Sequence, residues 1–129
     1  NGEGVIQDYK EAVRWYRKSA EQGLPQAQLS LGNRYNKGQG VLQDYKEAVK
    51  WDRLAAEQGF VPAQFNLGLM YVKGEGVLKD YVMAHMYWNI AATSGNNRAI
   101  ENRSKVEGVM TPSQIAEAQK LAREWMLTH

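Results

Sequence analysis

The chain has no cysteine and only two histidines, His85 and His129. Without cysteine it cannot form a disulfide, use a thiolate as a nucleophile, or bind a metal through sulfur. Two histidines are too few for a multi-histidine metal site within this chain, and we expect His85, which follows an alanine on a helix, to be a structural or a surface histidine. The sequence also lacks the common serine, histidine and glycine motifs of hydrolases and nucleotide-binding loops. It therefore predicts a protein that is not an enzyme and uses no cofactor.

Long hydrophobic runs and a strong excess of one charge are also missing. No apolar stretch approaches the roughly 18–20 residues that a transmembrane helix needs, and the start of the chain has no secretory signal pattern. The 16 basic and 14 acidic residues leave a net charge of +2, which is small for a nucleic-acid-binding domain. We expect neither a membrane span nor a nucleic-acid partner. With 43% hydrophobic residues, the 129-residue chain is sufficient for one domain with a buried core.

What the chain does contain is an internal repeat. The pattern Gly-x-Gly-Val-x-x-Asp-Tyr occurs at Gly2–Tyr9, Gly38–Tyr45 and Gly74–Tyr81, so successive copies start 36 residues apart. A fixed period of this length is typical of a solenoid, in which one supersecondary unit stacks on copies of itself. Solenoids usually present an extended, curved surface to another macromolecule.

Each copy reads as a pair of helices. In the second copy, apolar residues recur at helical spacing up to Gly74, where a positive φ lets the chain leave the helix. An aspartate after the turn begins the next helix. We expect Asp44 to form a capping box with Glu47, and Asp8 to form one with Glu11. The sequence thus predicts an all-α protein, an α/α superhelical solenoid of 36-residue helix-turn-helix repeats.

Large and small residues recur at fixed positions of the repeat. Trp15 and Trp51 occupy the same position in two copies, and we expect both to lie in the buried stripe. Gly32 and Gly68 fall in the middle of a helix, where glycine costs about 1 kcal/mol relative to alanine. Their recurrence indicates a close approach of the neighbouring helix, with one of these tryptophans packed beside each glycine.

The first residues align with the end of a helix and its turn rather than with the start of a repeat. We therefore expect the chain to be the C-terminal part of a longer protein with more repeats upstream. The first helix, predicted at about residues 9–22, then has no preceding neighbour. We expect its apolar atoms to be partly exposed and open to self-association, near Tyr9, Val13, Tyr16 and Ala20.

The other end of the chain has the features of a closing helix. Thr111–Gln114 predicts a capping box with proline at the first helical position, and an apolar face follows it. We expect one repeat domain over residues 1–129, ending in a C-terminal capping helix. Its units are a partial repeat at about 1–23, full repeats at 24–59 and 60–95, a degenerate repeat at 96–108, and the capping helix at 111–127.

Two copies carry a longer motif, Asp-Tyr-x-x-Ala-x-x-Trp…Ala-x-x-Gly followed by Ala-Gln-x-x-Leu-Gly-x-x-Tyr-x-x-Gly-x-Gly-Val. This motif resembles the Sel-one-like repeat (SLR) family, which is related to tetratricopeptide repeats, and the resemblance covers nearly the whole chain. The third copy departs from it, because Arg103-Ser104 replaces the Leu-Gly pair and Glu107 replaces the tyrosine. The resemblance implies a right-handed α-superhelix that serves as a protein-interaction scaffold, often in bacterial envelope or secreted proteins.

The resemblance also implies where a partner binds. In related repeats the helix with the Ala-Gln-x-x-Leu-Gly-x-x-Tyr motif lines the concave face, so its residues outside the core are expected to contact a protein or an extended peptide. Asparagine can pair with both N–H and C=O of a peptide, and arginine can bind a carboxylate with two bonds. The candidate partner-binding residues are Asn33, Phe65, Asn66, Leu69, Arg98 and Asn102.

Two other functions stay open. The first is an electrostatic adaptor for acidic partners. Basic residues recur at helical spacing on two adjacent helices, at Lys10, Arg14 and Arg17 and at Lys46, Lys50 and Arg53. Glutamates on the same helices favour a solvated face instead. The second is an accessory repeat domain of a larger regulator.

Overall fold

The computed structural model describes the backbone of residues 2–129 and the side chains of all these residues except 2, 3, 5 and 6. The described residues form seven α-helices and no strand. The helices are α1 (Gly2–Glu21), α2 (Pro25–Lys37), α3 (Tyr45–Glu57), α4 (Val61–Lys73), α5 (Tyr81–Thr93), α6 (Asn97–Glu107) and α7 (Pro112–Thr128). None of these helices has the length and apolar character of a transmembrane span.

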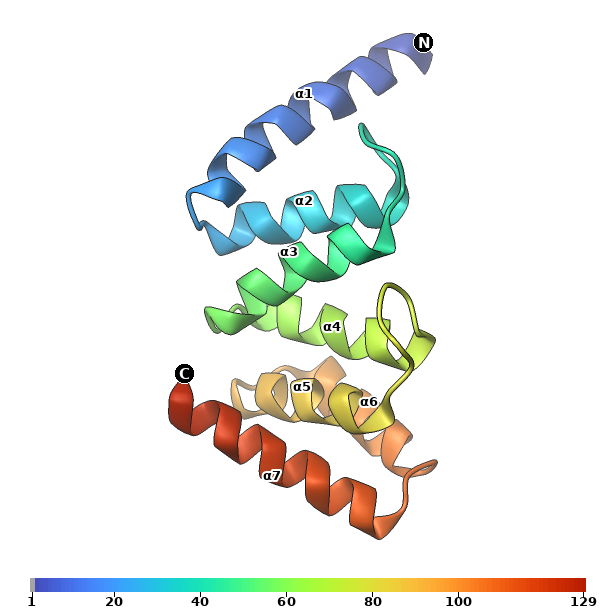
Figure 1. Ribbon diagram of the computed structural model, residues 1–129, viewed down its shortest axis with the longest axis vertical. Coiled ribbons are helices and arrows are strands. Elements are labelled where there is room, and N and C mark those ends of the chain that lie inside the picture. The colour runs from blue at the N-terminus through green and yellow to red at the C-terminus, as the bar shows by residue number, and fades with distance from the viewer. Residues whose placement is uncertain (1) are drawn as a thin grey trace.

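The helices stack in chain order along the long axis of the molecule, with α1 at one end and α7 at the other (Figure 1). Each of the first five helices packs against the next one, and α7 packs against α5. The turns after α2 and α4 project from the same edge of the stack (Figure 1). The predicted all-α solenoid of helix-turn-helix repeats with a closing helix is confirmed.

Glycine turns and aspartate caps separate the helices as predicted. Helices α2 and α4 end at Gly38 and Gly74, which are left-handed with φ of 68° and 69°. Asp44 caps α3 by accepting two hydrogen bonds, of 3.0 and 3.2 Å, from backbone N–H groups of its first turn. The predicted return bond from Asp44 to Glu47 is wrong, because the Asp44 N–H donates to the Tyr35 carbonyl oxygen at 3.0 Å.

Helix α1 is unbroken over Gly2–Glu21, so the predicted turn before Asp8 and the predicted cap at Asp8 are wrong. The later copies explain the difference. A side chain at Gly40 would overlap the carbonyl group of Tyr9, and the next copy repeats this contact, so each later turn is held against the preceding helix pair. In the described chain the first copy has no preceding pair to hold a turn, and helical hydrogen bonds form instead.

The mid-helix glycines make room for side chains of the following helix pair. A methyl group at Gly32 would overlap Oδ1 of Asp52, and one at Gly68 would overlap the indole nitrogen of Trp88. The predicted close approach is therefore confirmed. The predicted tryptophan partners are wrong, because the contacting residues, Asp52 and Trp88, stand one position after the repeat position that Trp15 and Trp51 occupy.

The two equivalent tryptophans of the repeat have opposite environments. Trp51 is 6% exposed and packs backward onto the α1–α2 pair, in a cluster with Val13 and Ala20. Trp15 is 65% exposed, because in the described chain α1 has no earlier pair behind it. Its predicted place in the core is wrong. The predicted exposure of Val13 and Ala20 is also wrong, since both side chains lie in the buried cluster with Trp51.

Candidate functional site

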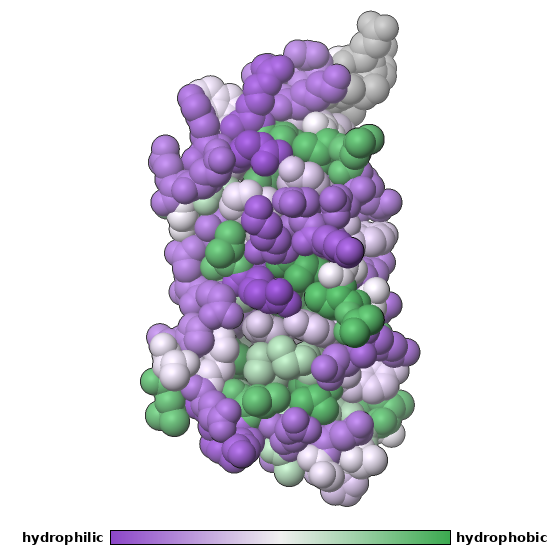
Figure 2. All heavy atoms as spheres, in the orientation of Figure 1, coloured by the Kyte–Doolittle hydropathy of each residue, from purple (hydrophilic) through white to green (hydrophobic). Residues whose placement is uncertain are grey.

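The candidate partner-binding residues lie on the first helix of successive repeats. They are on α2 (Asn33), on α4 (Phe65, Asn66 and Leu69) and on α6 (Arg98 and Asn102). Arg98 is exposed and Phe65 is buried, while the other four are half-buried. We use "the α2–α4–α6 surface" for the solvent-accessible side chains of these three helices. On the face shown in Figure 2, hydrophilic side chains predominate and apolar ones form several separate areas.

Arg98 and Phe65 join α6 to α4. The guanidinium carbon of Arg98 lies 4.5 Å from the centroid of the Phe65 ring, which is a cation–π contact. The Phe65 ring is itself supported by Trp88, whose ring centroid is 6.4 Å away. Phe65 therefore positions Arg98, and Arg98 is the exposed member of the pair.

Leu69 and Asn102 line one pocket between α4 and α6, with a volume of about 320 Å³. The remaining lining residues are Val72, Tyr81, Trp88, Lys105, Val106 and Val109. Sequence reasoning missed Tyr81 and Val109 as site residues, because they belong to α5 and to the turn after α6. The motif marks only its own helices, and neighbouring elements add residues to the same pocket.

Asn66 neighbours a buried acid. Asp52 has no exposed surface, and neither of its carboxyl oxygens makes a hydrogen bond of normal geometry. Burial raises the pKa of the Asp52 carboxyl from 3.8 to about 8, and the Asn66 side chain offsets part of this rise. The carboxyl is therefore mainly neutral at pH 7. The sequence indicates that this position is unusual, since Asp52 stands where the other copies have the aromatic residues Tyr16 and Trp88.

The two basic stripes have partners inside the molecule. Arg17 donates to the Tyr35 hydroxyl and Arg53 donates to the Tyr71 hydroxyl, both at 2.7 Å. These bonds connect α1 to α2 and α3 to α4. Two more basic side chains form ion pairs with glutamates of their own helix, as Arg14–Glu11 and Lys50–Glu47. The basic face is thus interrupted by internal contacts.

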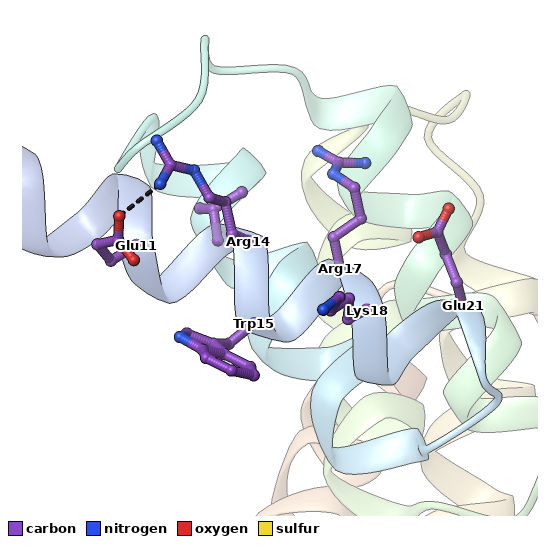
Figure 3. A pocket seen from close by; sticks show the side chains of 7 residues that line it. Glu11, Arg14, Trp15, Arg17, Lys18 and Glu21 are labelled. Atoms are coloured by element: carbon purple, nitrogen blue, oxygen red, sulfur yellow. Dashed lines mark hydrogen bonds and ion pairs between the residues drawn. The ribbon is translucent and has the colours of Figure 1, made fainter.

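The outer side of α1 carries a second, open pocket of about 420 Å³ (Figure 3). Its lining comes from α1 alone, and the indole of Trp15 extends from the helix there beside Lys18, whose Nζ is 5.6 Å from the ring centroid. Tyr9 and Tyr16, which we expected to be partly exposed on this helix, are half-buried and both lie beside the Arg34 guanidinium. Self-association through α1 stays a prediction.

Each of the two histidines bonds with a glutamate. His85 is fully buried, and its Nε2 lies 2.8 Å from Oε2 of Glu107, which agrees with the expected structural role. His129 bonds with the Glu57 carboxylate and with the Trp125 carbonyl oxygen, and these bonds raise the pKa of His129. In the part of the chain that the structure describes, no group of three acidic or histidine side chains is arranged to hold a metal ion.

Stacked helix pairs, joined by left-handed glycines and capped by aspartates, define the class of α-solenoid repeat proteins. Comparison with family models then identifies the kind of repeat. The Sel1 repeat matches residues 1–24, 25–60 and 61–96. The chain belongs to the Sel1 repeat family, whose members are typically protein-interaction modules.

Several solved structures are similar to the chain, including the following two. One is a protective antigen present in uropathogenic Escherichia coli strains that displays an SLR fold, with 41% identity, a TM-score of 0.88, and coverage of 91% of this chain and 25% of that chain. The other is a Sel1 repeat protein from Oxalobacter formigenes, with 42% identity, a TM-score of 0.70, and coverage of 73% and 39%. The chain thus spans about a quarter and two fifths of these proteins. No curated protein gives a significant match.

Proposed function

We propose that the protein is a non-enzymatic binding module that presents the α2–α4–α6 surface to a protein or an extended peptide. The observation that carries this proposal is the pocket between α4 and α6. Leu69 and Asn102 come from different repeats, and both line this one cavity on the proposed surface. A cavity lined mainly by apolar side chains, with a few polar groups, is the usual form of a ligand site.

The chemistry of the surface suits a peptide. Asn33, Asn66 and Asn102 supply amide groups on three successive first helices, and each amide can donate to and accept from a peptide backbone. Arg98 adds an exposed cation held over an aromatic ring. Groups spread over three repeats fit an extended ligand better than a compact one.

The alternative function, an electrostatic adaptor, has less support. Arg17 and Arg53, one in each basic stripe, donate to tyrosine hydroxyls within their own helix pairs. A partner bound through the remaining charges would show an affinity that falls steeply with added salt, because exposed charge interactions are screened. A partner bound in the apolar pocket would show a weaker dependence.

The test is the affinity of the natural partner, identified by cross-linking in cells and then measured with purified proteins by calorimetry. The double variant Asn66→Ala, Arg98→Ala is expected to bind at least about tenfold more weakly, since central contact residues each contribute on the order of 1–2 kcal/mol. The matched control is Gln119→Ala, Arg123→Ala, which removes an exposed amide and an exposed guanidinium from α7. Unchanged affinity of the first variant, with both variants folded, contradicts the proposal.

A further inference from the structure

The pocket between α4 and α6 has an apolar floor. Trp88 and Val106 form its base and are 3% and 5% exposed. The indole N–H of Trp88 already donates to the Phe65 carbonyl oxygen at 3.0 Å, so it is not available to a ligand. Leu69 and Val72 add further apolar surface from α4. The cavity of about 320 Å³ is of a size that takes one large apolar side chain.

The rim of this pocket carries positive charge. Lys105 lines it, and the Nζ of Lys79 lies 5.1 Å from the ring centroid of another lining residue, Tyr81. None of the residues that line the pocket is an aspartate or a glutamate. Helix α6 has two acids: Glu107 bonds with the buried His85, and Glu101 is exposed one turn before Lys105, outside the pocket lining. An apolar floor beneath a cationic rim complements a ligand that carries an apolar group and a carboxylate close together.

We propose that this pocket binds an acidic peptide segment, in which one large apolar side chain enters the cavity and a neighbouring carboxylate pairs with Lys105. The Asn102 amide pairs with the peptide backbone between these two groups. This inference rests on the proposed function and specifies the chemistry of its partner. The acidic side chain gives selectivity against neutral apolar peptides, because the ammonium group at the edge of an apolar pocket forms a stronger hydrogen bond with a charged acceptor.

The experiment uses the full chain and short, terminally blocked peptides with one leucine and one glutamate on a glycine–serine background, spaced one, two or three residues apart. Binding is followed by nuclear magnetic resonance of the ¹⁵N-labelled protein up to millimolar peptide. The best leucine–glutamate peptide is expected to shift the backbone signals of pocket residues and the indole signal of Trp88. Replacing its glutamate by glutamine, or its leucine by serine, is expected to weaken binding about tenfold.

Two exposed pocket positions allow variants with little effect on folding. Val109 is 64% exposed, and Val109→Asp places an acid in the pocket, while Lys105→Glu reverses the rim charge. Both are expected to weaken the best peptide about tenfold or more. The matched controls, Leu42→Asp on the equivalent exposed turn one repeat earlier and Lys120→Glu on α7, are expected to bind like the wild type. Equal binding by Val109→Asp and Leu42→Asp overturns the inference.

Other outcomes separate the inference from the proposed function. Absence of pocket shifts with every peptide overturns the inference, even if the natural partner still depends on Asn66 and Arg98. Equal binding of glutamate and glutamine peptides overturns the acidic part. Pocket shifts on dilution without peptide would assign the site to a second copy of the chain and also overturn it. If the peptides bind as expected but the affinity of the natural partner does not depend on Asn66 and Arg98, the inference about the pocket stands and the proposed function fails.

Discussion

At the scale of single residues, one position of the repeat faces the mid-helix glycine and is filled in two different ways. Trp88 fills it with an indole whose N–H is hydrogen-bonded to the Phe65 carbonyl oxygen. Asp52 fills the equivalent space with a carboxyl that has no hydrogen bond of normal geometry. Burying an unpaired polar group is unfavourable, and burying it charged is more so. The second repeat is therefore less stable at this position than the third.

Asp52 makes the free energy of unfolding depend on pH. With a pKa of about 8 when folded and 3.8 as its ordinary value, the folded protein keeps a proton that the unfolded chain releases between about pH 4 and pH 8. Stability therefore falls as pH rises through this window, by about 1.4 kcal/mol per pH unit, and levels off above it. Asp52→Asn is expected to remove this slope and to be up to about 4 kcal/mol more stable at pH 7.

Urea unfolding measured at several pH values checks this prediction. The control is Asp44→Asn, which changes an exposed aspartate and keeps a good helix cap, so the slope of the wild type is expected to remain. Identical pH slopes for wild type and Asp52→Asn are the contrary result.

At the scale of helices, a side-chain hydrogen bond joins the two helices of each pair, and the residues that form this bond change along the stack. Arg53 of α3 donates to the Tyr71 hydroxyl of α4, and α1 and α2 are connected in the same way. In the third pair the direction is reversed, because Arg103 of α6 donates to Asn89 of α5 at 2.7 Å. Arg103 is one of the residues by which this copy departs from the motif. The departure thus preserves a connection between the paired helices.

The helix caps supply a matched comparison between copies. Asp44→Ala removes the acceptor for two N–H groups of α3 and is expected to lower the free energy of unfolding by about 1 kcal/mol. Asp8→Ala changes the equivalent aspartate within the unbroken helix α1 and is expected to cause no loss, because alanine has the higher helix propensity. Urea denaturation of both variants measures the difference. An equal loss in the two variants would mean that Asp8 caps a helix after all.

The sequence was sufficient to predict the repeat, its turns and its helix pairs, because glycine turns and aspartate caps are local signals. Contacts between repeats were harder to predict. The turn before Asp8 needs a preceding helix pair to hold it, and the burial of Trp15 needs the same support, so periodicity alone predicted both wrongly. The sequence predicted only part of the lining of the pocket between α4 and α6, since Tyr81 and Val109 lie outside the motif-bearing helices.

At the scale of the whole molecule, each helix pair after the first packs a large side chain onto the pair before it. Trp51 packs onto α1 and α2. Tyr87, one period later, stacks on Tyr71 with 6.0 Å between ring centroids and 14° between ring planes. Trp15 holds the same position but is exposed on the outer side of α1. Stability is therefore carried by contacts between neighbouring pairs, as in other solenoids.

Truncating the two equivalent tryptophans tests this view of the stack. Trp51→Ala is expected to lower the free energy of unfolding by about 3–5 kcal/mol, because it leaves a cavity between two helix pairs. Trp15→Ala removes an exposed side chain and is expected to change stability by less than about 0.5 kcal/mol. Thermal or urea unfolding distinguishes them. Comparable losses would show that Trp15 is buried in solution, for example by a second molecule.

We propose that the first helices of the repeats, and not the basic faces of α1 and α3, bind the partner. Hydrogen–deuterium exchange of the chain, with and without its natural partner, tests this most directly. We expect slower exchange on binding in α2, α4 and α6, strongest around the pocket that contains Leu69 and Asn102. Slower exchange confined to α1 and α3, with these three helices unaffected, would contradict it.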